Sequence, residues 1–256
     1  MTSEPSLLLV LGLAAAVFAV AALYSSVGHG GASGYLAVLS LFAWGGPKEM
    51  ATTALVLNIL VAGIACRNYM KAGHMSTSLT WPFIVLSVPA AFLGGMLPVS
   101  RHLYFLLLAG VLLFTAVRLI VPTSFKSRKH NFRTPSLTTT IPAGAGIGLL
   151  SGIVGIGGGI FLSPLALLMR WANAKRISAT AACFIVVNSI AGLVGRMVSG
   201  RLSFGPFLPM VVAAMIGGII GSYCGANRFT SCGLKRILAL VLLVAAVKLI
   251  MTAFSQ

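Results

Sequence analysis

The chain has 256 residues, of which 58% are hydrophobic and only 8% are charged. A soluble domain contains about 25% charged residues, so this composition excludes a water-soluble fold and predicts a surface that faces lipid. The charge is one-sided, because 18 Lys and Arg residues stand against 2 acidic residues. The basic residues lie between long apolar runs, where they indicate membrane topology rather than a nucleic-acid partner.

Ten apolar runs follow one another along the chain and predict an all-α integral membrane protein. Most contain about 20 residues, which as a helix span the hydrocarbon core of a bilayer. Two runs are short and each follows a glycine cluster, so we expect two broken helices that cross about half of a bilayer. The runs lie at residues 7–27, 34–45, 50–70, 79–98, 102–121, 137–154, 159–170, 177–199, 205–225 and 234–254, with 34–45 and 159–170 as the short ones.

A long polar stretch at residues 122–135 divides the chain almost in half. We expect a first membrane repeat over 1–121, a basic cytoplasmic linker over 122–135 and a second membrane repeat over 136–256. We call the ungapped alignment that places residue 27 on residue 154 the repeat register. In this register the halves match at Val27/Val154, Gly28/Gly155, Gly30/Gly157, Gly31/Gly158, Trp44/Trp171, Lys48/Lys175, Thr53/Thr180 and Gly73/Gly200. Shared Gly and Ala content does not explain the Trp, Lys and Thr matches, so we interpret the halves as a duplicated five-segment unit.

An odd number of crossings in each unit turns the second unit upside down in the membrane, and the positive-inside rule tests this arrangement. With the linker in the cytoplasm and ten crossings, 13 of the 18 basic residues fall inside and five fall outside, namely Lys48, Arg101, Arg196, Arg201 and Lys248. If the short segments are re-entrant, the split becomes ten against eight. The larger excess inside favours two inverted five-segment repeats, with both termini outside.

Glycine clusters at residues 28–34 and 155–159 precede the two short segments and form the predicted substrate site. Non-helical chain at membrane depth is tolerated only where it is buried or lines a cavity. In inverted repeats the two half-helices begin close together, and the free N–H groups and positive dipole ends of their first turns favour an anion. The alternative is tight helix packing through small residues. The expected site residues in these clusters are His29, Gly30, Gly31, Ala32, Ser33, Gly157, Gly158 and Gly159.

His29 is a candidate for binding the substrate or a coupled proton, with a packing role as the alternative. Five polar residues within the apolar runs are further candidate substrate contacts, namely Thr53, Asn58, Thr180, Asn188 and Arg196. Each of these residues also has a structural interpretation. Each asparagine forms an interhelical hydrogen bond, each threonine forms a hydrogen bond to the backbone of its own helix, and the arginine extends its side chain to the membrane interface.

Acidic residues are missing from the apolar runs, because Glu4 is terminal and Glu49 stands at a helix start. Carriers of cations usually need carboxylates within the membrane, so their absence favours an anionic substrate. The four cysteines, Cys66, Cys183, Cys224 and Cys232, form no metal motif and are expected to pack as small apolar residues. We expect no metal, no cofactor and no nucleic acid. The expected partners are a small anion and the lipid bilayer, and the sequence leaves open whether the chain forms a homodimer.

The motifs resemble the sulfite exporter TauE/SafE family over nearly the whole chain. The resemblance rests on residues 27–36 (VGHGGASGYL), residues 47–58 (PKEMATTALVLN) and residues 151–159 (SGIVGIGGG) followed by Pro164. The first copy departs from the plainer glycine run at His29 and Ala32, where the second copy has Ile156 and Gly159. The resemblance implies a permease of the bacterial cytoplasmic membrane for sulfur oxyanions or organosulfonates, such as sulfite.

We therefore expect a secondary transporter that exports small sulfur-containing anions. An uptake permease or a channel for another inorganic anion is the alternative within transport. A membrane-embedded enzyme is the rival class; it needs a nucleophile with its base or a metal cluster, and scattered histidines without acids offer neither. A membrane scaffold subunit is a third interpretation, and it predicts no cavity at the glycine clusters.

Overall fold

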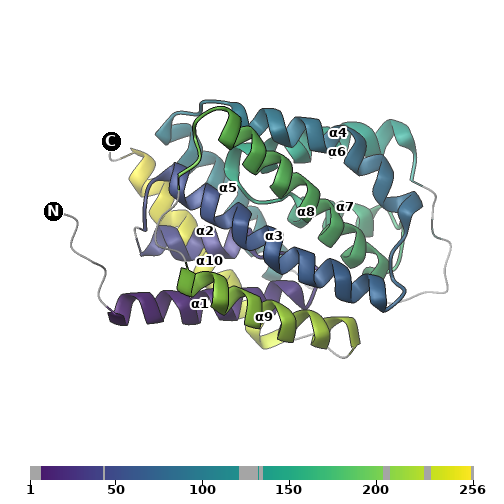
Figure 1. Cartoon of the computed structure of the whole chain (residues 1–256), viewed down its shortest axis with the longest axis horizontal. Helices are drawn as coiled ribbons and strands as arrows, with labels where there is room; N and C mark the ends of the chain where they lie inside the picture. The colour runs from purple at the N-terminus through teal and green to yellow at the C-terminus, as the bar shows by residue number, and fades with distance from the viewer. Residues whose placement is uncertain are drawn as a thin grey trace.

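The structure is a computed structural model that describes residues 7–42, 44–120, 132, 135–203, 208–227 and 232–254. Within these residues the chain forms ten helices, so the all-helical prediction is confirmed (Figure 1). They are α1 (Leu7–Ser25), α2 (Ala32–Leu41), α3 (Pro47–Lys71), α4 (Thr77–Met96), α5 (Arg101–Ile120), α6 (Leu137–Val154), α7 (Gly159–Leu168), α8 (Ala174–Val198), α9 (Leu208–Asn227) and α10 (Cys232–Phe254). Glu4 and the expected linker 122–135, apart from Phe132 and Pro135, lie outside the described residues.

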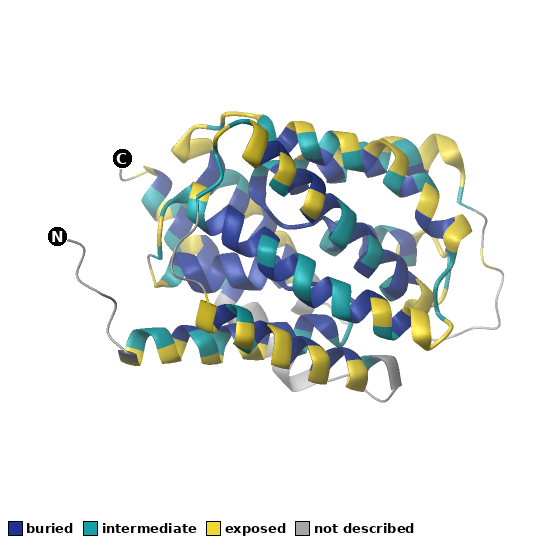
Figure 2. Cartoon of the chain, viewed as in Figure 1, coloured by how far each residue is buried: buried dark blue, intermediate teal, exposed yellow. Residues whose placement is uncertain are grey.

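The outer surface of the bundle is apolar, as a lipid-facing surface must be. Six helices of the described chain are long and apolar enough to cross a membrane, namely α1, α3, α4, α6, α8 and α9. Their outward faces carry large hydrophobic side chains, such as Leu8 at 82% exposed, Leu208 at 72% and Trp81 at 68% (Figure 2). Exposed apolar patches of this extent are not stable in water. The chain is therefore a multi-pass membrane protein.

The short helices α2 and α7 have ten residues each, and the repeat register carries the bounds of one onto the other. The same register carries the bounds of α3 onto those of α8, and both of these helices have 25 residues. Gly31 precedes α2 with φ 97°, and Gly158 precedes α7 with φ 78°. Glycine enters this left-handed region at little cost, which explains why a glycine stands at the start of each short helix.

Helices from the two halves are interleaved rather than separated. α1 packs on α9, α4 packs on α6 and on α8, α5 packs on α10, and the long helices α3 and α8 contact each other. Close approach depends on glycine: a Cβ atom at Gly148 of α6 would collide with the carbonyl oxygen of Ser87 in α4, and one at Gly221 of α9 would collide with that of Ala22 in α1. Small residues at helix contacts allow van der Waals packing between backbones where lipid gives no hydrophobic driving force.

The cysteine side chains that the structure describes differ in their surroundings. Cys66 of α3 is buried with Ala65 and Ala182, and Cys183 of α8 packs against this group, as predicted for small apolar residues. Cys224 lies exposed on α9, while the side chain of Cys232 is outside the described part of the chain.

Candidate functional site

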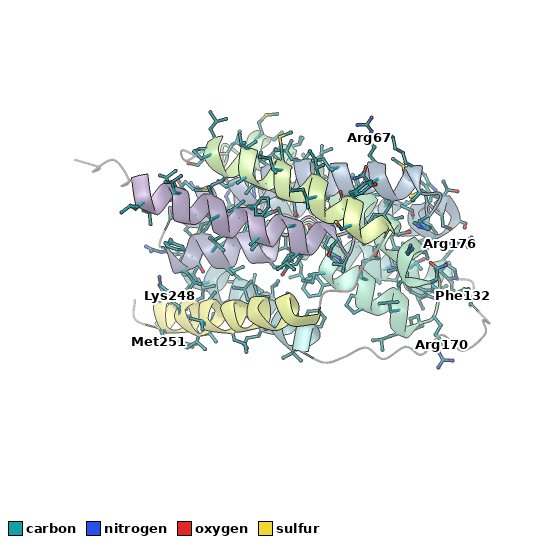
Figure 3. The ribbon with its side chains drawn as sticks, turned by 90° about the horizontal axis from the view of Figure 1, so that it is seen from below. Arg67, Phe132, Arg170, Arg176, Lys248 and Met251 are labelled. Carbon is teal, nitrogen blue, oxygen red and sulfur yellow. The ribbon has the colours of Figure 1, made fainter. Side chains whose placement is uncertain are left out.

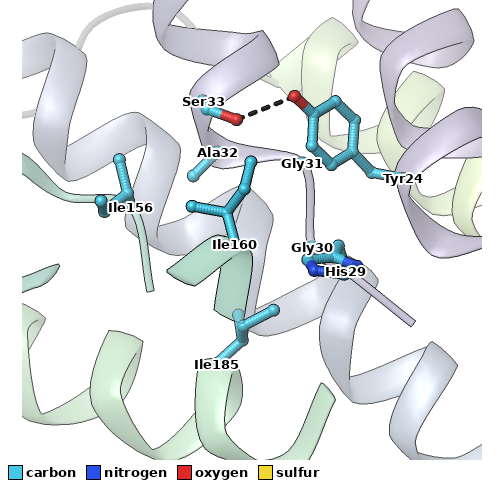
Figure 4. Close-up of a pocket in the computed structure, with 9 residues that line it drawn as sticks. All are labelled: Tyr24, His29, Gly30, Gly31, Ala32, Ser33, Ile156, Ile160 and Ile185. Atoms are coloured by element: carbon cyan, nitrogen blue, oxygen red, sulfur yellow. Dashed lines mark hydrogen bonds between the residues drawn. The ribbon is translucent and has the colours of Figure 1, made fainter. Parts of the chain in front are cut away.

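A small cavity lies where the first turns of α2 and α7 meet (Figure 4), and we call it the half-helix cavity. It contains about 180 Å³ of space between atoms, part of which is open to solvent, and it has room for about one water molecule. This conformation is therefore nearly closed around its site. The lining residues are Tyr24, His29, Gly30, Gly31, Ala32, Ser33, Ile156, Ile160 and Ile185.

The positive ends of both short helices point toward this cavity. The first N–H groups of a helix have no partner within the helix, and that of Ala32 donates to Oδ1 of Asn58 at 3.1 Å. At the other end of α2, Nζ of Lys248 donates to the carbonyl oxygens of Ser40 at 3.0 Å and Leu41 at 2.7 Å. A cation thus compensates the negative end of α2, while its positive end stays at the cavity, where an anion is favoured.

Hydroxyl groups form one wall of the cavity. The hydroxyls of Tyr24 and Ser33 share a hydrogen bond of 2.8 Å, drawn in Figure 4. Tyr35 does not line the cavity, but its buried hydroxyl lies close by: it has no hydrogen-bond partner in the described part of the chain and would be 2.9 Å from a Cβ atom at Gly31. A hydroxyl can donate to an anion and carries no charge of its own. The wall is therefore polar but uncharged.

The imidazole of His29 connects the two halves at the cavity. Its Nδ1 lies 3.0 Å from the carbonyl oxygen of Val27, within its own loop. Its Nε2 lies 3.2 Å from the carbonyl oxygen of Gly159, the first residue of α7. The ring also stands edge-on to Tyr24, with 6.5 Å between ring centroids. His29 is thus held between the loop before α2 and the start of α7.

The side-chain amide of Asn58 secures both loops from behind the cavity. It accepts from Ala32, as described, and its Nδ2 donates to the carbonyl oxygen of Ile156 at 3.1 Å and approaches Oγ of Ser189 at 3.5 Å. Asn58 is fully buried in α3. A buried amide with partners on both sides fixes the spacing of the groups that it joins. Asn58 therefore positions the cavity wall without lining it.

The second glycine cluster supports the walls of the cavity rather than lining it. Gly157 has φ 71°, and a Cβ atom there would crowd Nδ2 of Asn58 at 2.5 Å. Gly158 caps α7 in the left-handed conformation, and Gly159 offers its carbonyl oxygen to His29. Of the eight residues predicted in the clusters, the five at 29–33 line the cavity and the three at 157–159 surround it.

Four other predicted contacts lie away from the cavity lining. Oγ1 of Thr180 is 3.0 Å from Oγ1 of Thr80 in α4, and Thr53 is buried in α3. Asn188 donates from Nδ2 to the carbonyl oxygen of Phe184 in its own helix at 2.9 Å. Arg196 donates to carbonyl oxygens at the end of α6. In this conformation these side chains make contacts within and between helices, so their role as substrate contacts stays a prediction.

Sequence reasoning missed several cavity residues. Ile185 could have been found, because the repeat register places it opposite Asn58. Ile156 and Ile160 could have been found as neighbours of the second glycine cluster. Tyr24 carries no spacing signal, because its hydroxyl reaches the cavity only through the packing of α1 on α2.

A metal site is not formed by the described residues, since no three His, Cys, Asp or Glu side chains gather there.

Comparison with known proteins gives a direct indication of function. The family model described as "Sulfite exporter TauE/SafE" matches residues 13–249. No solved structure matches the chain.

Two bacterial relatives carry transporter names. The chain is 35% identical over 243 residues to "Probable membrane transporter protein y4hK" of Sinorhizobium fredii (strain NBRC 101917 / NGR234), covering 94% of this chain and 98% of that protein. It is 31% identical over 104 residues to "Probable membrane transporter protein YunE" of Bacillus subtilis (strain 168), covering 41% of this chain and 38% of that protein. With a half-helix cavity inside a multi-pass bundle and a family match over almost its whole length, the chain belongs to the sulfite exporter TauE/SafE family and is a membrane transporter, not an enzyme.

Proposed function

We propose that the chain is a secondary transporter of the bacterial cytoplasmic membrane that exports small sulfur-containing anions, such as sulfite or organosulfonates. The substrate binds in the half-helix cavity, between the N-termini of α2 and α7. The observation that carries this proposal is the convergence of two helix starts on one cavity with a hydroxyl wall. Helix N-termini that meet at a break between repeats are a recurring substrate site in transporters.

The charges of the described chain support an anion over a cation. Its one acidic residue, Glu49, lies in the first turn of α3 and accepts from the N–H of Gly46 at 2.9 Å and from Oγ of Ser203 at 2.8 Å. Glu49 is not among the cavity lining. A cation that left water for this cavity would meet the positive ends of two helices and no carboxylate, which is unfavourable. An anion would meet N–H and O–H donors.

An inverted repeat is part of the proposal, and exchanged contacts support it. A Cβ atom at Gly28 would meet Ser178 of α8, and one at Gly155 would meet Ala51 of α3. The repeat register carries Gly28 onto Gly155 and Ala51 onto Ser178. Each loop thus packs on the long helix of the other half, as two-fold related repeats require. Rocking of one repeat against the other would then open the cavity to alternate sides.

The positions of basic residues support a cytoplasmic linker. Arg67, Arg170 and Arg176 lie at one end of the bundle together with Phe132, a described residue within the linker (Figure 3). Lys248 and Met251 lie at the opposite end (Figure 3). An excess of basic residues marks the cytoplasmic side of a membrane protein. We therefore assign the end with Arg67 to the cytoplasm.

Binding measurements on the purified protein test the substrate class. Calorimetry or thermal shift should detect saturable binding of sulfite or small sulfonates, and the same anions should move in proteoliposomes. Carboxylates of equal size should bind more weakly, because a sulfonate offers three oxygens to the donors of the cavity and a carboxylate offers two. Saturable binding of nickel, cobalt or an ammonium compound, without binding of any oxyanion, would contradict the proposal.

A further inference from the structure

A buried hydroxyl group without a partner lies beside the half-helix cavity. Tyr35, at the end of the first turn of α2, is 0% exposed, and its hydroxyl forms no hydrogen bond within the described part of the chain. An unsatisfied hydroxyl in a protein interior is costly, because it has given up its hydrogen bonds to water. Such a group calls for a partner that another state of the protein supplies.

The side chain of Tyr35 points back to the start of α2. Side chains in an α-helix lean toward its N-terminus, over the turn that precedes them. The N–H group of Tyr35 donates to the carbonyl oxygen of Gly31 at 2.9 Å, and a Cβ atom at Gly31 would lie 2.9 Å from the tyrosine hydroxyl. Gly31 lines the cavity and has no side chain that could cover this hydroxyl. The hydroxyl therefore lies next to the proposed anion site.

The packing of a short helix does not require a hydroxyl at this place. The repeat register carries Tyr35 onto Leu162 of α7, which is also 0% exposed and belongs to an apolar core. The other half of the chain thus fills the same position with an apolar side chain. An apolar ring at residue 35 would avoid the cost of the buried hydroxyl. A contact with a ligand therefore explains the tyrosine better than packing does.

The other donors at the cavity already have partners in this conformation. The hydroxyls of Tyr24 and Ser33 bond to each other at 2.8 Å, and the N–H of Ala32 donates to Asn58 at 3.1 Å. An anion that uses these donors draws them away from existing bonds, whereas the hydroxyl of Tyr35 gives up none. A bond from Tyr35 to the anion also removes the cost of the unsatisfied group, so it contributes more to affinity than a donor that is already paired.

We infer that the hydroxyl of Tyr35 donates a hydrogen bond to an oxygen of the bound anion when the cavity widens around it. The inference rests on the proposed anion site and adds a binding residue that does not line the cavity in this conformation. The cavity has room for about one water molecule, so a sulfonate must enlarge it. Enlargement beside Gly31 brings the hydroxyl of Tyr35 into contact with the anion.

Tyr35→Phe tests the inference, because it removes the hydroxyl and keeps the ring. Calorimetry on the purified protein should show an affinity for methanesulfonate that is lower by about ten- to a hundredfold, as expected for a lost hydrogen bond to a charged group. The melting temperature without methanesulfonate should stay the same or rise, because an unsatisfied hydroxyl has left the interior. A hydroxyl that serves only packing would give the opposite result, with lower stability and unchanged affinity.

Thr52→Val is the matched control. Thr52 of α3 also has a fully buried hydroxyl without a partner among the described residues, and it is not part of the cavity lining. Its replacement should likewise keep or raise the melting temperature, while the affinity for methanesulfonate stays that of the unmodified chain. Tyr35→Leu, which copies Leu162 of the second half, provides a second test if Tyr35→Phe does not fold, and it should weaken binding at least as much.

The outcomes distinguish the role of Tyr35 from the anion site itself. If the unmodified chain binds methanesulfonate and Tyr35→Phe binds it equally well, the role of Tyr35 is overturned and the anion site stands. An equal loss of affinity in Thr52→Val, or a melting temperature that falls together with the affinity in Tyr35→Phe, would also overturn that role. If the unmodified chain binds neither methanesulfonate nor sulfite, the anion site is overturned and the inference with it.

Discussion

Arg196 and Ile153 are joined by a hydrogen bond of 2.7 Å from Nη2 of the guanidinium to the carbonyl oxygen. The same nitrogen donates to the carbonyl oxygen of Gly152 at 3.1 Å, and Arg196 is 2% exposed. In the first half, the hydroxyl of Tyr69 donates to the carbonyl oxygen of Ser26 at 3.0 Å. The repeat register carries Tyr69 onto Arg196 and Ser26 onto Ile153. Arg196 therefore secures the end of α6, as Tyr69 secures the turn after α1.

Arg196→Met should lower stability more than it lowers anion binding. It leaves one buried and one partly buried carbonyl group at the negative end of α6 without their charged donor, which we expect to cost about 2 to 3 kcal/mol. The check is the melting temperature in detergent together with the Kd for a sulfonate. Arg67→Met, at an exposed position of α3, is the control and should change neither. Loss of binding at unchanged stability would instead show that Arg196 contacts the substrate, as the sequence predicts.

Asn58→Ala should weaken anion binding and transport strongly. It removes the acceptor of the Ala32 N–H and the donor to Ile156, so the starts of both short helices lose their fixed spacing. Two lost hydrogen bonds at about 1 kcal/mol each correspond to a decrease in affinity of about thirtyfold. Calorimetry with a sulfonate measures the change.

Asn188→Ala is the matched control for that experiment. Asn188 is as fully buried as Asn58, but its amide donates within its own helix, to Phe184. Its replacement should reduce stability while the affinity for the sulfonate stays close to that of the unmodified chain. An equal loss of affinity in both variants would show that the amide of Asn58 has no special role at the cavity.

Gly30→Ala should abolish transport although alanine adds a single methyl group. A Cβ atom at Gly30 would collide with Oδ1 of Asn58, which holds the first N–H group of α2. Gly63→Ala in α3 is the control, because nothing lies within 4 Å of a Cβ atom there. Sulfonate flux in proteoliposomes, normalised to the amount of inserted protein, gives the comparison. Normal flux in Gly30→Ala would mean that this loop does not approach the substrate.

Cysteine labelling in intact cells tests the proposed orientation. In a chain without its native cysteines, a membrane-impermeant maleimide should label single cysteines at Arg101 and Phe254. It should miss those at Arg67 and Arg176 until the membrane is permeabilised. All four positions are exposed in the structure, so accessibility alone does not decide the result. The reverse pattern would show that the protein has the opposite orientation, with the end that carries Arg67 and Arg176 outside the cell.

The helices and the approximate place of the breaks are predictable from the sequence. Apolar run length predicts each helix, and the bounds of α6 coincide with the predicted run 137–154 because Ser136 and Gly155 punctuate its ends. The glycine clusters predict that α7 begins at Gly159, whereas α2 begins at Ala32, inside its cluster and before the predicted run 34–45. Gly31 and Gly158 precede the two helices because glycine takes the left-handed conformation at little cost. The small number of charged residues predicts that the outer surface faces lipid. These properties are local, so they can be read along the chain.

Which polar groups contact one another depends on how the helices pack. The hydroxyls of Tyr24 and Ser33 come together because α1 packs on α2. Asn58 faces the cavity wall while Asn188 bonds to its own helix, although both are buried amides within long apolar helices. The carbonyl group of Gly159 reaches His29 from 130 residues away. Such contacts depend on how helices from both halves interleave. The local sequence pattern does not predict that arrangement, because a buried polar side chain can bond to any of several groups on neighbouring helices.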